Sequence, residues 1–345
     1  MKYLRKDLEG MVPYHTPYLT EGIILNANES PYNAPQQIID LYVEEVKKIN
    51  FNRYPDMDST LLKDAIAKAY DLKRENVACG VGSDEILQCL FNAVVSKGDK
   101  VVVMNPSFSM YSEYAKIYGA TPVMADANPD FTFNLDNMLN AIRNSNPRMV
   151  VLCSPNNPTG IMLSEDDVRK IIESTDALVI LDEAYIEFSG EQGLIKLINE
   201  YSNLVVLRTF SKLYAGAAIR LGYALSIKDN IDLIDTVRSP YNVNVLTQLM
   251  AKTIIEHKVL YKERIQYFKD QRRAIYEALT KLGIEVYPTK ANFLWMKLSD
   301  KINEALAREN IYVRTMTFNG EKYNRVCIGT PDEVEEFLKV VRQNA

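Results

Sequence analysis

The sequence predicts an α/β protein: a large domain with a mostly parallel β-sheet covered by helices, followed by a smaller α+β domain. Short, nearly continuous runs of Val, Ile and Leu alternate with amphipathic helical segments up to about residue 240. Beyond that point long helical stretches and closely spaced strands replace this alternation. The length of 345 residues also exceeds what one small core supports.

Each element follows from the spacing of apolar residues. Helical spacing after Pro35, Ser59 and Ser83 indicates three early helices. The expected strands of the large domain are 100–104, 121–124, 148–153, 178–182, 204–207 and 222–225, with helices at 110–118, 135–143 and 165–173. A helical stretch then runs from about 245 to 282, broken near His257, and strands 285–287 and 293–297 follow it. The remaining elements are a helix at 301–309, short strands around Val313 and at 325–328, and a last helix from Asp332. We therefore expect an N-terminal arm (1–30), a large domain (31–240) and a small domain (241–345).

Composition narrows the possible functions. The net charge of −5 and the lack of a basic cluster with interleaved aromatics argue against nucleic-acid binding. Apolar stretches such as Ala177–Leu181 are too short for a membrane span, and residues 1–10 lack the apolar core of a secretory signal. The four cysteines show no metal-ligand spacing, so we expect no metal and a reducing cytosol.

Lys212 is the most informative single residue. It ends the segment Thr209-Phe210-Ser211-Lys212, directly after the apolar run 204–207, and Arg220 follows eight residues later. A lysine at the end of a buried strand, near hydroxyls and an arginine, can bind an aldehyde cofactor as a Schiff base and hold its phosphate. Two upstream motifs, SPNNPTG (154–160) and LDEAY (181–185), favour pyridoxal 5′-phosphate (PLP) as that cofactor.

A phosphate site is indicated before the third early helix. Glycines in GVGSDE (80–85) let the backbone approach an anion, and the free N–H groups of the helix start point at it. Ser83 is a possible cap of this helix, and the motif alone favours a plain capped helix after a turn. The hydroxyls of Thr209 and Ser211 and the guanidinium of Arg220 add further phosphate-binding groups, so a phosphate site becomes the favoured interpretation. The expected phosphate ligands are Gly82, Ser83, Asp84, Thr209, Ser211 and Arg220.

Other strand ends offer partners for the cofactor ring. Asp182 ends the strand 178–182, and a carboxylate there points into the ligand crevice of a parallel sheet, where it would pair with the protonated pyridine nitrogen. Tyr185 and Asn157 could donate to the phenolic oxygen, and Phe108 could stack on the ring. Taken singly, these residues are compatible with a helix cap, a turn and a core aromatic.

Taken together, the motifs resemble those of fold-type-I PLP-dependent aminotransferases, and within that family histidinol-phosphate aminotransferase and its near relatives. The likeness covers nearly the whole chain and is carried by these segments: LNANE (25–29), RYPD (53–56), GSDE (82–85), PSFSMY (106–111), SPNNPTG, LDEAY, TFSK (209–212), IRLGY (219–223), ANFLW (291–295) and RVCIGT (325–330).

The resemblance implies a role for each matching residue. Lys212 would bond the cofactor and move the proton, and its pKa is expected to be lowered by burial and by Arg220. Asp182, Asn157 and Tyr185 would bind the ring, and the phosphate ligands named above would hold the phosphate. Tyr54 would reach that phosphate from the other subunit of a homodimer. The expected substrate-binding residues are Arg325 for a carboxylate, Arg314 for the phosphate of histidinol phosphate, Tyr14 from the N-terminal arm, and Asn28 of LNANE.

The implied reaction converts histidinol phosphate and 2-oxoglutarate to imidazole-acetol phosphate and glutamate in histidine biosynthesis. Pro331-Asp332 stands where Arg-Glu is frequent in histidinol-phosphate enzymes, and Leu213–Ile219 differs from the usual glycine pattern. Two alternative reactions therefore stay open, those of a threonine-phosphate decarboxylase and an aromatic amino-acid aminotransferase. A further alternative is a protein of the same fold that binds a ligand without turnover, for example as a regulator. The intact set of cofactor residues argues against the last.

Overall fold

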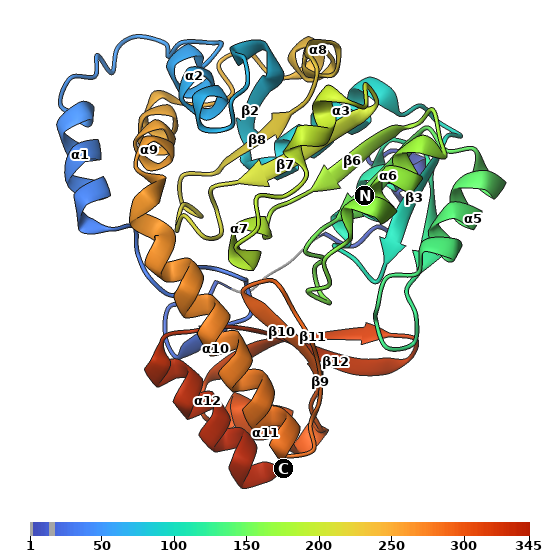
Figure 1. Cartoon of the computed structure of the whole chain (residues 1–345), viewed down its shortest axis with the longest axis vertical. Helices are drawn as coiled ribbons and strands as arrows, with labels where there is room; N and C mark the ends of the chain where they lie inside the picture. The colour runs from blue at the N-terminus through green and yellow to red at the C-terminus, as the bar shows by residue number, and fades with distance from the viewer. Residues whose placement is uncertain (1–2, 14–17) are drawn as a thin grey trace.

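The computed structural model describes residues 3–13 and 18–345, so the predicted substrate residue Tyr14 lies outside the described part. Two β-sheets organise the chain (Figure 1). The larger sheet has the strand order β2-β8-β7-β6-β5-β3-β4 and the smaller one the order β1-β11-β12-β10-β9. The fold class predicted from the sequence is confirmed.

The larger sheet is parallel except for one strand. Its strands are β2 (Val77–Val81), β3 (Lys100–Asn105), β4 (Thr121–Asp126), β5 (Met149–Cys153), β6 (Leu178–Asp182), β7 (Leu204–Thr209) and β8 (Leu221–Leu225). Only β8 runs against its neighbours, β2 and β7. Strands β5, β6 and β7 are buried along their whole length, which explains their continuous apolar runs.

Helices cover both faces of this sheet. Residues that alternate along β3 enter two separate cores: Val102 packs with one face, Val101 and Val103 with the other. The helices of this part are α1 (Gln36–Val46), α2 (Thr60–Ala69), α3 (Gly82–Val94), α4 (Met110–Ile117), α5 (Leu135–Ser145), α6 (Glu165–Glu173), α7 (Ile186–Ser189), α8 (Lys228–Val237) and α9 (Val245–Glu256). Apolar residues of α3, α4 and α8 fill one core, and those of α2, α5, α6 and α9 fill the other.

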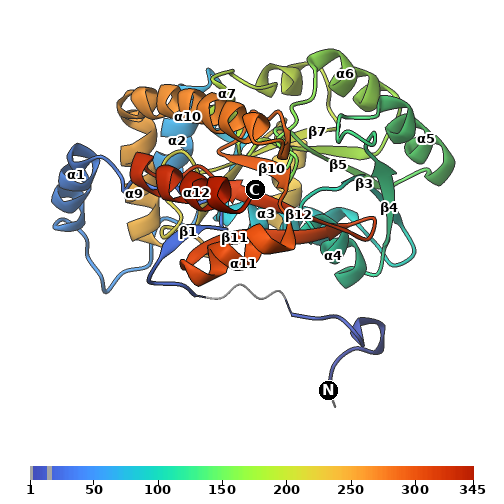
Figure 2. The same cartoon turned by 90° about the horizontal axis from the view of Figure 1, so that it is seen from below.

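The smaller sheet forms the lower part of the molecule in Figure 1. It contains β1 (Ile23–Leu25), β9 (Glu285–Tyr287), β10 (Phe293–Lys297), β11 (Ile311–Phe318) and β12 (Glu321–Cys327). The helices α10 (Lys262–Lys281), α11 (Asp300–Arg308) and α12 (Pro331–Asn344) belong to the same part, and Figure 2 shows them from below. Short 3₁₀ turns occupy Lys6–Leu8, Arg74–Asn76, Ile195–Asn199 and Lys258–Tyr261.

The structure adds elements that the sequence did not predict. Strand β1, from the expected N-terminal arm, pairs in parallel with β11, and β2 and α8 were not expected either. The short strands expected around Val313 and at 325–328 are a longer hairpin, β11–β12. The break near His257 is confirmed, because α9 ends at Glu256 and α10 begins at Lys262. The division of the chain at residues 30 and 240 stays a proposal.

Helices of bilayer-spanning length and hydrophobicity are absent from the described ranges 3–13 and 18–345.

Candidate active site

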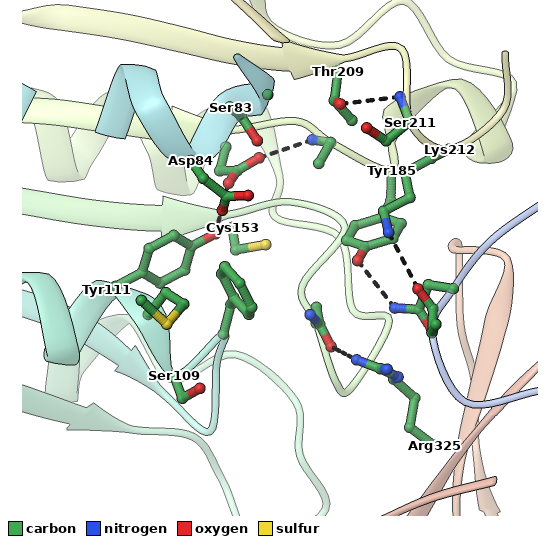
Figure 3. Close-up of a pocket in the computed structure, with 18 of the residues that line it drawn as sticks. Ser83, Asp84, Ser109, Tyr111, Cys153, Tyr185, Thr209, Ser211, Lys212 and Arg325 are labelled. Carbon is green, nitrogen blue, oxygen red and sulfur yellow. Dashed lines mark hydrogen bonds between the residues drawn. The ribbon is translucent and has the colours of Figure 1, made fainter. Parts of the chain in front are cut away.

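A cavity of about 430 Å³ opens where the carboxyl ends of β5, β6 and β7 meet the smaller sheet. Its size suits a cofactor with a small substrate. Fourteen of the sixteen predicted site residues line it: Asn28, Gly82, Ser83, Asp84, Phe108, Asn157, Asp182, Tyr185, Thr209, Ser211, Lys212, Arg220, Arg314 and Arg325. Figure 3 shows this pocket, with Lys212 above the ring of Tyr185 and Arg325 below it.

Lys212 projects into the pocket from the turn that follows β7. Its Nζ lies 3.4 Å from the carbonyl oxygen of Ala27 and 5.6 Å from the centre of the Tyr185 ring. Burial lowers the pKa of Lys212 to about 8, and the nearby Arg325 guanidinium adds to this effect. Arg220 was expected to contribute to this lowering of the pKa, whereas the cation that does so in the structure is Arg325.

Asp182 is a buried carboxylate at the pocket wall. It is only 4% exposed, and burial raises its pKa to about 6. Tyr111 donates from its hydroxyl to Asp182 Oδ2 at 2.8 Å, and the N–H of Ala184 donates to Oδ1 at 3.0 Å. Within the described ranges no Lys or Arg forms a salt bridge with it, so this carboxylate suits a cationic partner brought by a ligand.

Two asparagine side chains connect the cofactor side of the pocket to the smaller sheet. Asn28 donates from Nδ2 to the Tyr185 hydroxyl at 3.0 Å, and its Oδ1 accepts from the Cys327 thiol at 3.1 Å. Asn157 Oδ1 accepts from Arg325 Nη1 at 2.7 Å. Since the Asn157 oxygen faces the guanidinium, its amide nitrogen is the end that can donate to a ligand.

The opposite end of the pocket has the features of a phosphate site. Helix α3 starts at Gly82, whose φ is +73°, and a Cβ at that position would lie 2.8 Å from Arg220 Nη2. Arg220 also contacts Asp84 Oδ2 at 3.4 Å and Ser211 Oγ at 3.5 Å. The possible cap from Ser83 is not formed, because the helix begins at Gly82 and its N-cap position, Val81, has no side-chain cap. The start of α3 and the guanidinium of Arg220 therefore lie side by side at this end of the pocket, an arrangement that suits an anion.

The hydroxyls of Thr209 and Ser211 have different partners. Among the described residues, Ser211 Oγ has only the 3.5 Å contact with Arg220 named above. Thr209 Oγ1 donates to the carbonyl of Leu221 at 3.3 Å and accepts from the N–H of Ser211 at 3.1 Å, so it also stabilises the turn that carries Lys212.

Phe108 contacts Tyr111 edge-to-face, with ring centres 5.5 Å apart, and lines the pocket. Its position is suited to a stacking partner.

Two arginines enter the pocket from the β11–β12 hairpin. Arg314 and Arg325 are directly opposite each other in the strand register, so their side chains share one face of the smaller sheet. Arg325 bonds only neutral acceptors, Asn157 Oδ1 and the carbonyl of Asn26 at 2.6 Å, and its Nε is buried without a partner. In the part of the chain that the structure describes, neither guanidinium has a salt bridge, which favours an anionic ligand.

Tyr54 stands apart from the other predicted residues. It is 82% exposed, stacks on Tyr241 with ring centres 4.6 Å apart, and does not line the pocket.

Sequence reasoning did not assign functions to two contacts near the pocket. Tyr111, which bonds Asp182, lies in the first turn of α4, and its place in the motif PSFSMY was the available signal. Arg208 Nη2 pairs with Glu183 Oε2 at 2.7 Å, and both side chains are almost fully buried. This ion pair connects the segment before Lys212 to the one that carries Asp182 and has no local sequence signature.

The fold and the pocket define a two-domain α/β enzyme whose pocket contains a partly buried lysine, a buried carboxylate and a helix start next to an arginine. The family model for aminotransferase class I and II matches residues 20–341, so the chain belongs to that family. This confirms the family predicted from the motifs.

Named relatives are similar over nearly the full length. The chain is 36% identical to histidinol-phosphate aminotransferase of Caldanaerobacter subterraneus subsp. tengcongensis, covering 99% of this chain and 98% of that protein. It is 39% identical to the histidinol-phosphate aminotransferase of Pyrococcus furiosus, with coverage of 98% and 97%. It shares the fold of histidinol-phosphate aminotransferase from Sinorhizobium meliloti, solved in complex with pyridoxal-5′-phosphate, with a TM-score of 0.90, 21% identity and coverage of 100% and 99%.

Proposed function

We propose that this protein is a PLP-dependent histidinol-phosphate aminotransferase that uses 2-oxoglutarate as the amino acceptor. The observation that carries the proposal is the pair Arg314 and Arg325, two guanidinium groups without acidic partners in the described structure, facing the same pocket as Lys212. A planar guanidinium can form paired hydrogen bonds with either a phosphate or a carboxylate. One site can therefore hold histidinol phosphate and glutamate in turn.

The chemistry of the pocket residues fits PLP at both ends. Asp182, buried and without a salt bridge in the described ranges, would bind the pyridine nitrogen. The start of α3, with Arg220 and Ser211, would hold the phosphate, with Gly82 giving the close approach. Tyr185 and the amide nitrogen of Asn157 would donate to the phenolic oxygen, and Phe108 would stack on the ring. When bound, PLP supplies an aldehyde that takes up the amino group and a ring that delocalises the electron pair left by proton removal.

Lys212 is the proposed proton carrier at the substrate carbon. It is the only lysine among the described residues of the pocket wall, and its pKa of about 8 leaves a substantial neutral fraction near neutral pH. The turn set by Thr209 and the carbonyl of Ala27 hold the amine in the pocket. Arg325, fixed by Asn157, would orient the substrate anion so that its reacting carbon faces Nζ.

We further propose a cytosolic homodimer whose subunits share each site. Exposed apolar residues gather in the α1–α2 connection, the start of α2 and the segment entering α9: Phe51, Tyr54, Met57, Leu61, Tyr241 and Leu246. A patch of this kind is typical of a protein–protein interface. Tyr54 would reach the partner's phosphate site from this patch. The four unpaired cysteines fit a reducing compartment.

Half-reactions with single amino donors test the proposed substrate. Histidinol phosphate and glutamate should each change the absorbance of the bound cofactor, whereas phenylalanine and tyrosine should react much more slowly. Faster reaction with the aromatic donors would contradict the proposal, and release of carbon dioxide from threonine phosphate would select the decarboxylase alternative.

The two arginines can be tested separately. We expect Arg314→Ala to impair the histidinol-phosphate half-reaction more than the glutamate one, and Arg325→Ala to impair both. Loss of one buried charged contact costs about 2–5 kcal/mol. Equal effects of Arg314→Ala on both donors would remove its assignment to the phosphate.

A further inference from the structure

Phe131 has a backbone conformation that an aromatic residue rarely adopts. It lies in the connection between β4 and α5, is 4% exposed, and has a φ of +63°. The N–H of Phe131 donates to the carbonyl of Asn128 at 2.8 Å, and the N–H of Asn128 donates to the carbonyl of Thr132 at 3.0 Å. In the turn Asn128-Pro129-Asp130-Phe131, this position normally holds glycine, which adopts positive φ without strain.

The ring of Phe131 is inserted into an aromatic box on the smaller sheet. The box consists of Tyr287, Trp295, Phe318 and Tyr323, one residue from each of β9, β10, β11 and β12. The ring centres of these four lie 4.8, 5.8, 5.5 and 5.0 Å from that of Phe131, and three of the contacts are edge-to-face. In Figure 1 the connection below α5 reaches down toward these strands. Aromatic contacts of this geometry add stabilisation beyond area burial and offset the backbone strain.

The box shares a sheet face with the two pocket arginines. Trp295 is opposite Tyr287 on one side and opposite Arg325 on the other, and Arg325 is opposite Arg314. Residues directly opposite in antiparallel strands point to the same face. One face therefore presents Arg314 and Arg325 to the pocket and, beside them, an aromatic box that receives a side chain from the part carrying Lys212.

We propose that Phe131 is a positioning residue that fixes the arginine-bearing face of the smaller sheet relative to the cofactor-binding sheet. Near the pocket the two parts also make polar contacts, Arg325 to Asn157 and the N–H of Lys290 to the carbonyl of Gly160 at 2.8 Å, and one further ring contact, Tyr185 edge-to-face on Phe293 with ring centres 5.1 Å apart. Small misplacement of an anion-binding group relative to the reacting centre weakens productive binding strongly. Phe131 thus sets the affinity for the anionic substrates without touching them.

Phe131→Gly tests this in the intact holoenzyme. Glycine suits a φ of +63°, so the turn should persist while the ring is lost. Trp295, the only tryptophan of the chain and fully buried in the box, reports on the contact directly. We expect its emission to shift to longer wavelength and acrylamide to quench it more strongly. The KM for each amino donor should rise about tenfold while kcat stays within about twofold, the pattern of binding energy lost equally from the ground state and the transition state.

Matched variants separate positioning from general destabilisation. Phe133→Leu, two residues away in the same connection and without a ring contact to the box in the described ranges, should leave emission and KM unchanged. Phe131→Tyr keeps the ring, so Trp295 emission and KM should stay close to those of the wild type. Tyr287→Leu removes one wall of the box from the other side. It should act in the same direction and add little to Phe131→Gly, because both changes break one contact.

Two results would overturn the inference: unchanged Trp295 emission in Phe131→Gly, or altered emission with unchanged KM for every donor. The choice of substrates rests on the proposed function, but the two can fail separately. A wild-type enzyme that ignores histidinol phosphate would refute the proposed substrate, whereas Trp295 emission and the KM for glutamate would still decide the part played by Phe131.

Discussion

At the scale of single residues, Lys212 and Arg325 are coupled through charge. The cation of Arg325 disfavours a second positive charge nearby, so it lowers the pKa of Lys212 below what burial alone gives. Only the neutral amine attacks an aldehyde. We expect the rate of PLP uptake by the apoenzyme to fall about tenfold per pH unit below pH 8 and to level off above it.

Replacing Arg325 tests the sign of this coupling. Arg325→Gln should raise the pKa of Lys212 and move the pH profile of PLP uptake to higher pH, whereas Arg314→Gln should move it less. Stopped-flow absorbance measures both profiles. A profile of Arg325→Gln that coincides with the wild type would show that burial alone sets the pKa of Lys212.

Asp182 is expected to lower the stability of the apoenzyme in return for function. Burial raises its pKa to about 6, so holding the charged form at neutral pH is unfavourable, and this penalty grows as pH rises from about 4 to about 6. Asp182→Asn should therefore stabilise the apoenzyme at pH 7 by about 1–3 kcal/mol, less at pH 4. It should still bind PLP but react far more slowly, because an amide cannot stabilise a protonated ring nitrogen.

Thermal unfolding of the apoenzyme and single-turnover kinetics measure the two effects of Asp182→Asn separately. Near-normal turnover would show that Asp182 only shapes the turn before Tyr185.

At the scale of elements, the start of α3 is expected to recognise the phosphate and not the ring. Gly82→Ala places a Cβ 2.8 Å from Arg220 Nη2 at a φ of +73°. We expect PLP affinity to fall about tenfold or more, with little change for pyridoxal, which lacks the phosphate. Titration with the two aldehydes gives the comparison.

Gly98→Ala is the matched control for this helix start. Gly98 also has a positive φ, +95°, but an added Cβ there meets nothing within 4 Å. It should lower stability through the same backbone strain and leave PLP affinity intact. An equal loss of affinity for PLP and pyridoxal in Gly82→Ala would contradict a phosphate-specific role.

Local patterns predicted most elements of the larger sheet and the residues that follow them, since buried parallel strands read as continuous apolar runs whose carboxyl ends share one edge. Strand β1 was missed because it has three residues and gains its hydrogen bonds from β11, nearly 300 positions away. The contacts of Arg325 with Asn157 and of Phe131 with the aromatic box are likewise long-range. Such pairings depend on tertiary packing, which no window of sequence contains.

At the scale of the whole molecule, the pocket is completed only where distant parts meet. Residues of the LNANE segment, the larger sheet and the β11–β12 hairpin all line it. Asn28 bonds both Tyr185 and Cys327, so the segment after β1 connects the two sheets. Tyr54 does not line the pocket of its own chain. Its side chain is exposed, as a residue that acts across a subunit boundary would have to be.

Subunit mixing tests this last arrangement. Tyr54→Phe should weaken the grip on the phosphate, and Lys212→Ala should abolish turnover. In a mixed dimer, the site with Lys212 from the Tyr54→Phe subunit would receive Tyr54 from the Lys212→Ala subunit and would be intact. Equal mixing should therefore restore about a quarter of wild-type activity, since about half the dimers are mixed and each has one intact site.

Mixing Tyr54→Phe with the double variant Tyr54→Phe/Lys212→Ala creates no intact site and should restore nothing. Activity is measured after dissociation and reassociation, with sedimentation confirming dimers. Full activity of a monomer in dilute solution would rule out a shared site.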